Sequence, residues 1–267
     1  MSTLAYTVTD SATMLRRNLR RLQRYPSLTL MLIGMPIVFL LLFVYVFGGQ
    51  LSHGLGSAYV AGHTGRAGYL NYVTPGILLI TVAAAVQGTA IVVAMDMTGG
   101  IIDRFRTMAI ARSAVLTGHV LAALVQTLLS LGIVLGVAVA LGFRPSAGPL
   151  EWLGAIGVLL LFSFALIWLA TALGLAAKSV ETASNTPMFL TFLPFLGSAF
   201  VLTASMPAGL REFAHYQPFT PATETLRGLL TGTPIGSNAV STVAWSVGIA
   251  LASYLWARRL YAQRRSS

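Results

Sequence analysis

Long stretches without any charged residue alternate with short charged segments along this chain. Six of these stretches reach roughly the ~20 apolar residues that a helix needs to cross the hydrocarbon core of a bilayer. They are continuous apolar blocks and lack the alternation typical of membrane β-barrel strands. The pattern predicts an all-α integral membrane protein with six transmembrane helices, over residues 28–47, 73–95, 113–141, 152–177, 187–205 and 238–257.

Composition indicates the same class of protein. Of the 267 residues, 56% are hydrophobic and 9% are charged, which is too apolar for a water-soluble globule with one core. We therefore expect residues 1–267 to form a single transmembrane domain. The first apolar stretch is too long, and too far from the N-terminus, for a typical cleaved signal peptide, so we expect a retained span.

Arginine and lysine predict the orientation in the membrane, because positively charged loops stay in the cytoplasm. Six spans put both termini on one side, and that side carries 13 of the 17 positive charges. We expect both termini to be cytoplasmic, and the net charge of +10 to favour contact with anionic membrane lipids. No nucleic-acid binding is expected, because these arginines have no soluble domain to lie on. The other side carries Arg66, Arg144, Arg211 and Arg227.

Residues 1–27 contain a basic amphipathic segment, SATMLRRNLRRLQRYP. Leu15, Leu19 and Leu22 share one helical stripe, and the arginines lie on the opposite side. This pattern predicts an N-terminal helix in the plane of the lipid headgroups. Such a helix serves either as an anchor that fixes the topology or as a scaffold for a cytoplasmic partner.

A second charged segment, residues 96–112, separates the second and third apolar stretches. Asp103 lies near its start and Arg112 near its end, which suits the helix macrodipole. We expect a short cytoplasmic helix that either floats on the membrane surface or fills a groove in another protein. Its apolar stripe at helical spacing consists of Ile101, Ile102, Phe105, Met108 and Ala109.

Residues 206–237 are predicted to form a re-entrant helical hairpin on the extracytoplasmic side. Pro218 divides the segment into two pieces that are too short to span a membrane. In the second piece we expect Thr220 as the cap, Pro221 as the first helical residue and Gly232 just past the end.

Two charged residues of this hairpin, Glu224 and Arg227, have the i, i+3 spacing of neighbours on a helix. One interpretation is that they pair with each other, which lowers the cost of partial burial. The functional alternative is that they form an extracytoplasmic gate and line an exit for a substrate.

Catalytic and metal-binding chemistry finds little support in the sequence. The chain has no cysteine, and His53 and His63 have no third ligand at a metal-binding spacing. An intramembrane serine protease needs its nucleophile and base in contact, whereas Ser198 and His119 are expected at different depths. We predict no catalytic residue, no cofactor site and no metal site in this chain.

The sequence shows no site through which this chain could use ATP or an ion gradient as an energy source. The spans lack the intramembrane charges that ion-coupled transporters use. The only lysine, Lys178, follows Ala177 in GLAAKS, where a nucleotide-binding loop needs glycine. We expect another polypeptide to supply the energy, so that this chain is not itself an enzyme.

The order of these parts resembles the membrane subunit of type-2 ABC exporters, over essentially the whole chain. Two segments, DMTGGIIDRFRTMAIARS and SMPAGLREFAHYQPFTPATETLRGLLTG, are similar to permeases of the daunorubicin-resistance type. Such permeases belong to actinobacterial multidrug and antibiotic efflux systems. The resemblance therefore implies a multi-pass protein of a bacterial plasma membrane.

The resemblance implies that the first cytoplasmic loop forms a coupling helix, which sits in a groove of an ATPase subunit. An apolar side chain such as Phe105 suits a pocket, while the flanking charges set the choice of partner. Many relatives have proline where this chain has Ala109, so we expect the helix to be longer or differently angled. The implied ATPase-coupling contacts are Asp103, Arg104, Phe105 and Arg106.

The resemblance also implies two copies of the ATPase subunit, which bind ATP and Mg, and a second permease subunit. The permeases then form a homodimer or a similar heterodimer, with the substrate path between the first and fifth spans. Pro187 and Pro194 are expected to bend the fifth span. An amphipathic drug, antibiotic or natural product fits the resemblance best. Polysaccharides or lipid-linked glycans are the alternative substrates, and a membrane scaffold or sensor is the alternative without transport.

Overall fold

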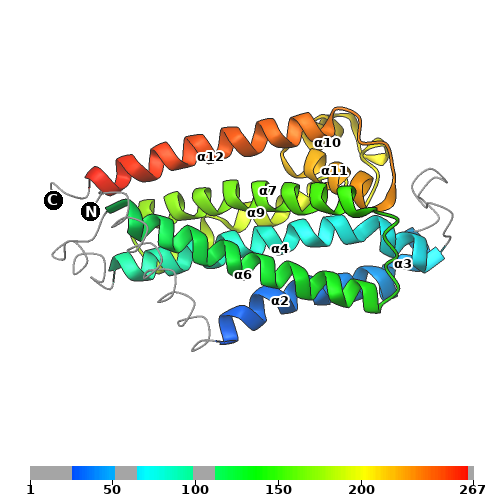
Figure 1. Ribbon diagram of the computed structural model, residues 1–267, viewed down its shortest axis with the longest axis horizontal. Coiled ribbons are helices and arrows are strands. Elements are labelled where there is room, and N and C mark those ends of the chain that lie inside the picture. Colours follow the sequence, from blue (N-terminus) through cyan, green and yellow to red (C-terminus); the bar gives the residue numbers. More distant parts are fainter. Residues whose placement is uncertain (1–25, 52–64, 99–111, 264–267) are drawn as a thin grey trace.

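The computed structural model describes residues 26–51, 65–98 and 112–263. Within these ranges all regular secondary structure is helical, and the long helices run lengthwise beside one another (Figure 1). The α-helices are α2 (Pro26–Leu41), α3 (Gly48–Leu51), α4 (Gly65–Thr98), α6 (Arg112–Ala140), α7 (Pro149–Ala176), α8 (Val180–Asn185), α9 (Met188–Phe192), α10 (Ala208–Tyr216), α11 (Phe219–Thr231) and α12 (Asn238–Gln263). A π-helix, η1 (Leu42–Phe47), joins α2 to α3, and 3-10 helices form η4 (Leu193–Leu196) and η5 (Thr203–Ser205).

Four helices in the described part of the chain are long and apolar enough to cross a membrane. The spanning parts are Gly65–Thr98, Leu116–Ala140, Pro149–Ala176 and Asn238–Leu260. A shorter apolar stretch, Leu32–Phe47, runs through α2 and the π-helix. These findings confirm an all-α protein with apolar spans, and the arrangement of six spans stays a prediction.

The fifth apolar stretch, residues 187–205, does not form the continuous helix that its apolar character predicted. We refer to these residues as the broken segment. It consists of α9, the 3-10 helix η4, an irregular turn and η5. Pro187 and Pro194 have no backbone N–H to continue a helix, and Gly197 ends η4 in an extended conformation. The segment leads from the end of α7 past α4 to α10 (Figure 1).

Helix α4 is the central element of the fold. It contacts α2, α6, α7, α8 and α11, and nearly all its residues from 68 to 86 are buried. It begins before the predicted stretch 73–95, because a helix does not have to end where charged residues begin. Helices α10 and α11 lie at the end where α4 begins, which we term the hairpin end (Figure 1). Helix α4 finishes and α6 begins at the opposite end, which we term the loop end.

Glycines allow the close helix contacts of this core. A Cβ added to Gly174 of α7 would lie 2.7 Å from the carbonyl oxygen of Ala90 on α4. A Cβ added to Gly76 of α4 would lie 2.6 Å from the Cβ of Ala199 in the broken segment. Both contacts depend on small residues, as is usual where membrane helices pack closely.

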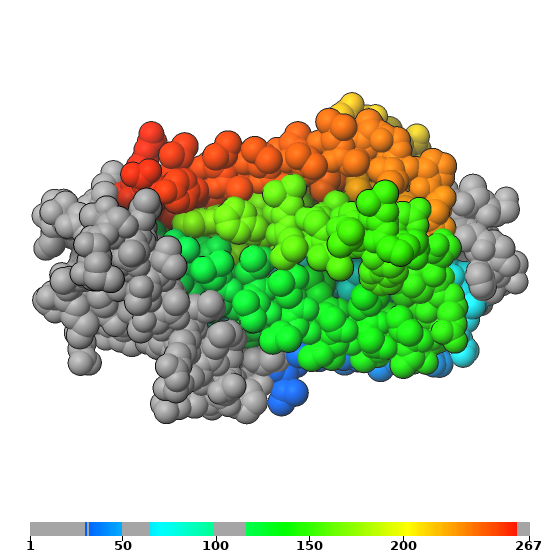
Figure 2. Space-filling view, in the orientation of Figure 1, coloured from blue at the N-terminus to red at the C-terminus, as the bar shows by residue number. Residues whose placement is uncertain are grey.

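Helix α12 packs against α7 and α11 and leaves much of its surface exposed. It forms one edge of the molecule beside α7, and α6 and α7 cover the adjoining face (Figure 2). Exposed apolar side chains are expected where a helix faces lipid, because no water is present there to disfavour them. The exposed stripe of α12 includes Val240, Val243, Val247, Leu251 and Leu255.

Candidate functional site

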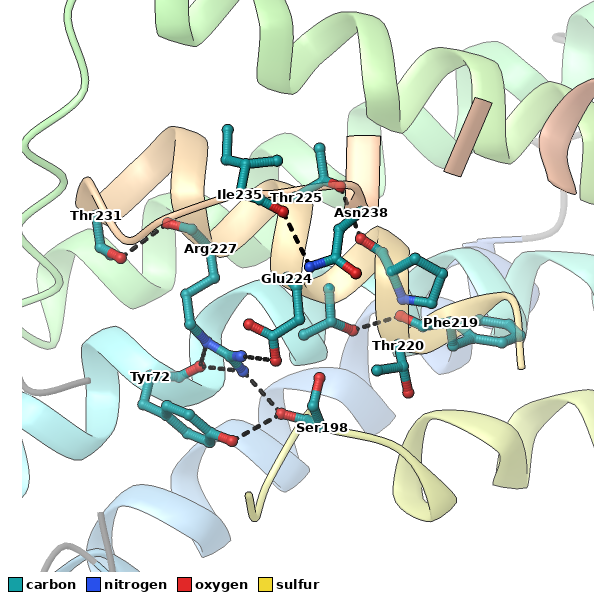
Figure 3. Close-up of polar contacts among 12 residues, drawn as sticks. Tyr72, Ser198, Phe219, Thr220, Glu224, Thr225, Arg227, Thr231, Ile235 and Asn238 are labelled. Atoms are coloured by element: carbon teal, nitrogen blue, oxygen red, sulfur yellow. Dashed lines mark hydrogen bonds and ion pairs between the residues drawn. The ribbon is translucent and has the colours of Figure 1, made fainter. Parts of the chain in front are cut away.

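A buried arginine joins three elements at the hairpin end. Arg227 of α11 is completely buried, with 0% of its surface exposed. Its Nε and Nη2 atoms donate to the carbonyl oxygen of Tyr72 at 3.2 Å, and Nη2 also donates to the carbonyl oxygen of Ser198 at 2.8 Å. Its Nη1 atom pairs with Oε1 of Glu224 at 2.5 Å (Figure 3). We term Tyr72, Ser198, Glu224 and Arg227 the Arg227 cluster.

Tyr72 contributes three different groups to this cluster. Its ring lies under the guanidinium, 3.8 Å from the Cζ atom of Arg227 to the ring centroid. Its carbonyl accepts from Arg227, and its hydroxyl donates to the carbonyl of Ser198 at 2.9 Å. One turn earlier on α4, the hydroxyl of Tyr69 donates to the carbonyl of Phe200 at 3.3 Å. Helix α4 therefore holds the broken segment through two tyrosine hydroxyls.

The backbone around the cluster departs from regular helix in two places. Pro75 lies inside α4 and removes one helix hydrogen bond, and Gly197 precedes Ser198 at the break in the fifth stretch. A Cβ added to Gly197 would lie 2.4 Å from Nε2 of Gln217. A larger residue at position 197 would therefore have to displace the side chain of Gln217 at the start of α11.

The start of α11 differs from the sequence expectation. The helix begins at Phe219 and not after Thr220, so Thr220 as the cap was wrong. The side chain of Gln217 takes that role, because its Oε1 accepts from the backbone N–H of Phe219 at 3.0 Å. The end of α11 is as expected: Gly232 adopts a left-handed conformation, with φ of 74°.

The contacts explain how a charged guanidinium can be buried. Burying an unpaired charge costs several kcal/mol, but here one carboxylate, two carbonyls and one aromatic face surround the guanidinium. The side chain of Glu224 is 18% exposed, so the cluster reaches the surface through its carboxylate. Arg227 and Glu224 form the ion pair that their spacing allowed, and Tyr72 and Ser198 are further partners that the sequence did not indicate. The arrangement ties α4, α11 and the broken segment together, and it opens only if several contacts break.

A second buried polar pair lies at the loop end. Nε2 of His119 on α6 lies 3.4 Å from Oδ2 of Asp96 on α4, and both side chains are at least 95% buried. Asp96 and Tyr72 are separated by about 36 Å along α4, at 1.5 Å per residue. Ser198 belongs to the Arg227 cluster and His119 to this pair, so the two cannot form a nucleophile and base.

Several sequence-predicted residues lie outside the described part of the chain. These are the coupling residues Asp103, Arg104, Phe105 and Arg106, the N-terminal amphipathic segment, and His53 and His63. The predicted segment 96–112 is shorter than expected, because residues 96–98 complete α4 and Arg112 begins α6.

Sequence reasoning missed Tyr69, Tyr72 and Asp96. The tyrosines lie at the edge of an apolar stretch, where aromatic residues usually mark the membrane interface, so nothing distinguished them. Asp96 immediately follows the apolar stretch 73–95 and was therefore placed in the charged segment beyond it. Its position near His119 depends on how α4 and α6 pack, which no local pattern reports.

A comparison with known protein families identifies the family of this chain. The family model described as "ABC-2 type transporter" matches residues 10–231. The chain belongs to the ABC-2 type transporter family. This ABC-2 permease is 29% identical over 248 residues to the "Daunorubicin resistance ABC transporter permease protein DrrB1" of Streptomyces coeruleorubidus, covering 92% of this chain and 81% of that protein.

A second relative has a similar name. The permease is 27% identical over 244 residues to the "Probable doxorubicin resistance ABC transporter permease protein DrrC" of Mycobacterium tuberculosis (strain ATCC 25618 / H37Rv), covering 89% of this chain and 83% of that protein. These matches confirm the resemblance to a type-2 ABC permease of the drug-resistance type. They also place the protein in a family of membrane transporter subunits.

Proposed function

We propose that this ABC-2 permease is the membrane subunit of an ATP-driven exporter of amphipathic drugs, antibiotics or natural products. The observation that carries the proposal is the family match over most of the chain, together with two relatives named for resistance to anthracycline drugs. The four apolar helices of spanning length support a membrane subunit. Because the chain has no nucleotide-binding loop, ATP and Mg bind to a separate ATPase subunit.

The proposed assembly contains two ATPase subunits and two permeases. The second permease is another copy of this chain or a similar protein, and the substrate path lies between them. Phe43 of η1 stacks on Phe200 of the broken segment, with ring centroids 4.1 Å apart. This contact supports a path wall built from the first and fifth apolar stretches of the chain.

Coupling to ATP hydrolysis is assigned to the loop between α4 and α6. In the proposed complex Phe105 fills a pocket of the ATPase subunit, and Asp103, Arg104 and Arg106 set its register. Movement of the loop then acts on two long helices at once, because α4 and α6 flank it directly. Because the ATPase subunits work in the cytoplasm, the loop end and both termini lie on the cytoplasmic side of a bacterial plasma membrane in this proposal.

The gate is assigned to the Arg227 cluster at the hairpin end. Glu224 is the partly exposed member, and its ion pair with Arg227 holds α11 against α4 and the broken segment. Opening an exit there requires these contacts to loosen while the substrate passes. Helix α4 can carry movement from the coupling loop to the gate, because it is one helix that extends from the Arg227 cluster to that loop.

Reconstitution tests the proposed function directly. The permease is co-expressed with a partner ABC ATPase subunit, and the complex is placed in liposomes. Uptake of fluorescent doxorubicin is then followed after ATP addition, with a hydrolysis-deficient ATPase as the control. We expect ATP-dependent uptake only with the active ATPase. Equal uptake in both preparations, or none in either, would contradict the proposal.

A further inference from the structure

The buried pair of Asp96 and His119 lies at the base of the proposed coupling loop. Asp96 is two residues before the end of α4, and His119 is in the second turn of α6. The atoms Oδ2 and Nε2 are 3.4 Å apart, and the side chains are 1% and 4% exposed. The pair therefore joins the helix that enters the loop to the helix that leaves it.

A cluster of buried apolar residues lies beside the pair. Val93, one turn before Asp96, belongs to a buried cluster with Leu116 and Val120 of α6 and with Ile167 and Trp168 of α7. Charged or strongly polar groups in such a place interact strongly, because little water is present to screen them. Removing either side chain of the pair therefore takes away an interaction that is stronger here than it would be in water.

Apolar packing alone fixes the register of α4 against α6 less strictly than the pair of Asp96 and His119 does. Apolar contacts such as those of Val93 and Leu116 have no preferred direction, so they constrain the register of two helices only weakly. The carboxylate of Asp96 and the imidazole of His119 lie 3.4 Å apart, and sliding α4 against α6 lengthens that distance and weakens their interaction. The pair consequently fixes the register of the two helices where the loop joins them.

We infer that Asp96 and His119 are positioning residues that keep the ends of α4 and α6 moving as one body when the coupling loop moves. The inference rests on the proposed function, because it assigns the pair a role in energy coupling. Without the pair, movement of the loop is absorbed by sliding between the two helices. With it, the same movement reaches the Arg227 cluster through α4.

The first test measures coupling in the reconstituted complex. Asp96→Asn and His119→Gln are compared with the exchanged double variant Asp96→His/His119→Asp. We expect each single variant to bind the ATPase and hydrolyse ATP, but to transport at least about 5-fold less doxorubicin per ATP, a typical allosteric coupling. The exchanged variant recovers much of that ratio. A ratio that stays at the wild-type value in the single variants would overturn the inference.

A matched control separates this role from general stability. Thr81 is also a buried polar residue of α4, but its hydroxyl donates to the carbonyl of Ile77 in the same helix. Thr81→Val therefore loses a hydrogen bond without loosening α4 from α6. We expect this variant to keep the wild-type ratio of transport to ATP hydrolysis. An equal loss of that ratio in Thr81→Val would show that the effect reports stability only.

The second test needs no ATPase and uses the full-length permease. The chain has no cysteine, so spin labels on Thr98→Cys and Thr117→Cys report the distance between α4 and α6 without background labelling. We expect a single narrow distance distribution with the pair intact and a broad one with His119→Gln. An equally narrow distribution in both would overturn the inference. If the distribution broadens but wild-type permease neither binds an ATPase nor transports, the proposed function fails and the register-fixing role remains.

Discussion

The guanidinium of Arg227 lies over the ring of Tyr72, with Cζ 3.8 Å from the ring centroid, and the same arginine donates to the carbonyl oxygen of that tyrosine. This double contact places a cation, an aromatic face and a backbone dipole in one buried site. Ser198 and Glu224 complete the site. The side chain of Arg227 therefore holds α4, α11 and the broken segment together.

Replacing Arg227 tests that dependence. In Arg227→Met the carboxylate of Glu224 loses the charge that it pairs with, and the carbonyls of Tyr72 and Ser198 lose the guanidinium as a donor. We therefore expect a loss of about 3–5 kcal/mol in stability. Arg227→Lys retains the charge but cannot bind two carbonyls and stack at once, so its loss is intermediate. The measurement is the thermal unfolding midpoint in detergent. A Met variant as stable as wild type would contradict this account of the cluster.

Tyr72→Phe removes the hydroxyl that donates to the carbonyl of Ser198. The ring and the carbonyl stay in place, and Ser198 keeps Arg227 as a donor, so we expect a loss of only about 1 kcal/mol. Tyr216→Phe is the control, because Tyr216 is 68% exposed and its change should stay within about 0.5 kcal/mol. Both variants are compared by denaturant or thermal unfolding. An equal effect of the two changes would argue against a role for the Tyr72 hydroxyl.

Sequence patterns predicted the long helices because each is a continuous apolar stretch that a bilayer stabilises only as helix. They predicted the end of α11 because Gly232 adopts a left-handed conformation at little cost. The family followed from the order of such local features along the chain. These properties depend on neighbours in sequence, which a pattern can report.

Other features could not be predicted because they depend on contacts between distant segments. The apolar character of residues 187–205 indicated a helix, but two prolines and Gly197 break it, and the freed carbonyl of Ser198 finds partners on α4 and α11. The spacing of Glu224 and Arg227 indicated an ion pair and gave no sign of Tyr72. Likewise, the proximity of Asp96 and His119 appears only once α4 packs against α6.

Two glycines of α4 provide a matched test of the contact with the broken segment. A Cβ at Gly76 would lie 2.6 Å from the Cβ and 2.9 Å from the Cα of Ala199, whereas a Cβ at Gly88 meets nothing within 4 Å. We expect Gly76→Ala to destabilise the protein by about 1–3 kcal/mol through overpacking. Gly88→Ala should be neutral or stabilising, because alanine favours helix by about 1 kcal/mol. Equal thermal midpoints for the two variants would contradict the packing of residue 199 against Gly76.

Glu224→Gln tests the proposed gate. The amide keeps the size of the side chain but removes the charge that pairs with Arg227. The equilibrium between the closed and the open state of the Arg227 cluster therefore changes. We expect the rate of ATP-dependent doxorubicin uptake to change by about 5-fold or more, while ATPase binding stays at the wild-type level. Thr231→Val is a control in the same helix, because its hydroxyl bonds only the α11 backbone in the described contacts. Unchanged transport in Glu224→Gln would remove the gate assignment.

Docking of an ATPase subunit at the loop between α4 and α6 is the central claim, and co-purification in detergent tests it most directly. A partner ABC ATPase subunit is purified with wild-type permease, with Phe105→Asp, and with Phe213→Asp as the control. Phe213 carries the same substitution in α10, at the hairpin end, and is 48% exposed. We predict that wild type and Phe213→Asp retain the ATPase and that Phe105→Asp loses it. Equal retention in all three, or retention in none, would contradict the claim that this loop couples the permease to ATP hydrolysis.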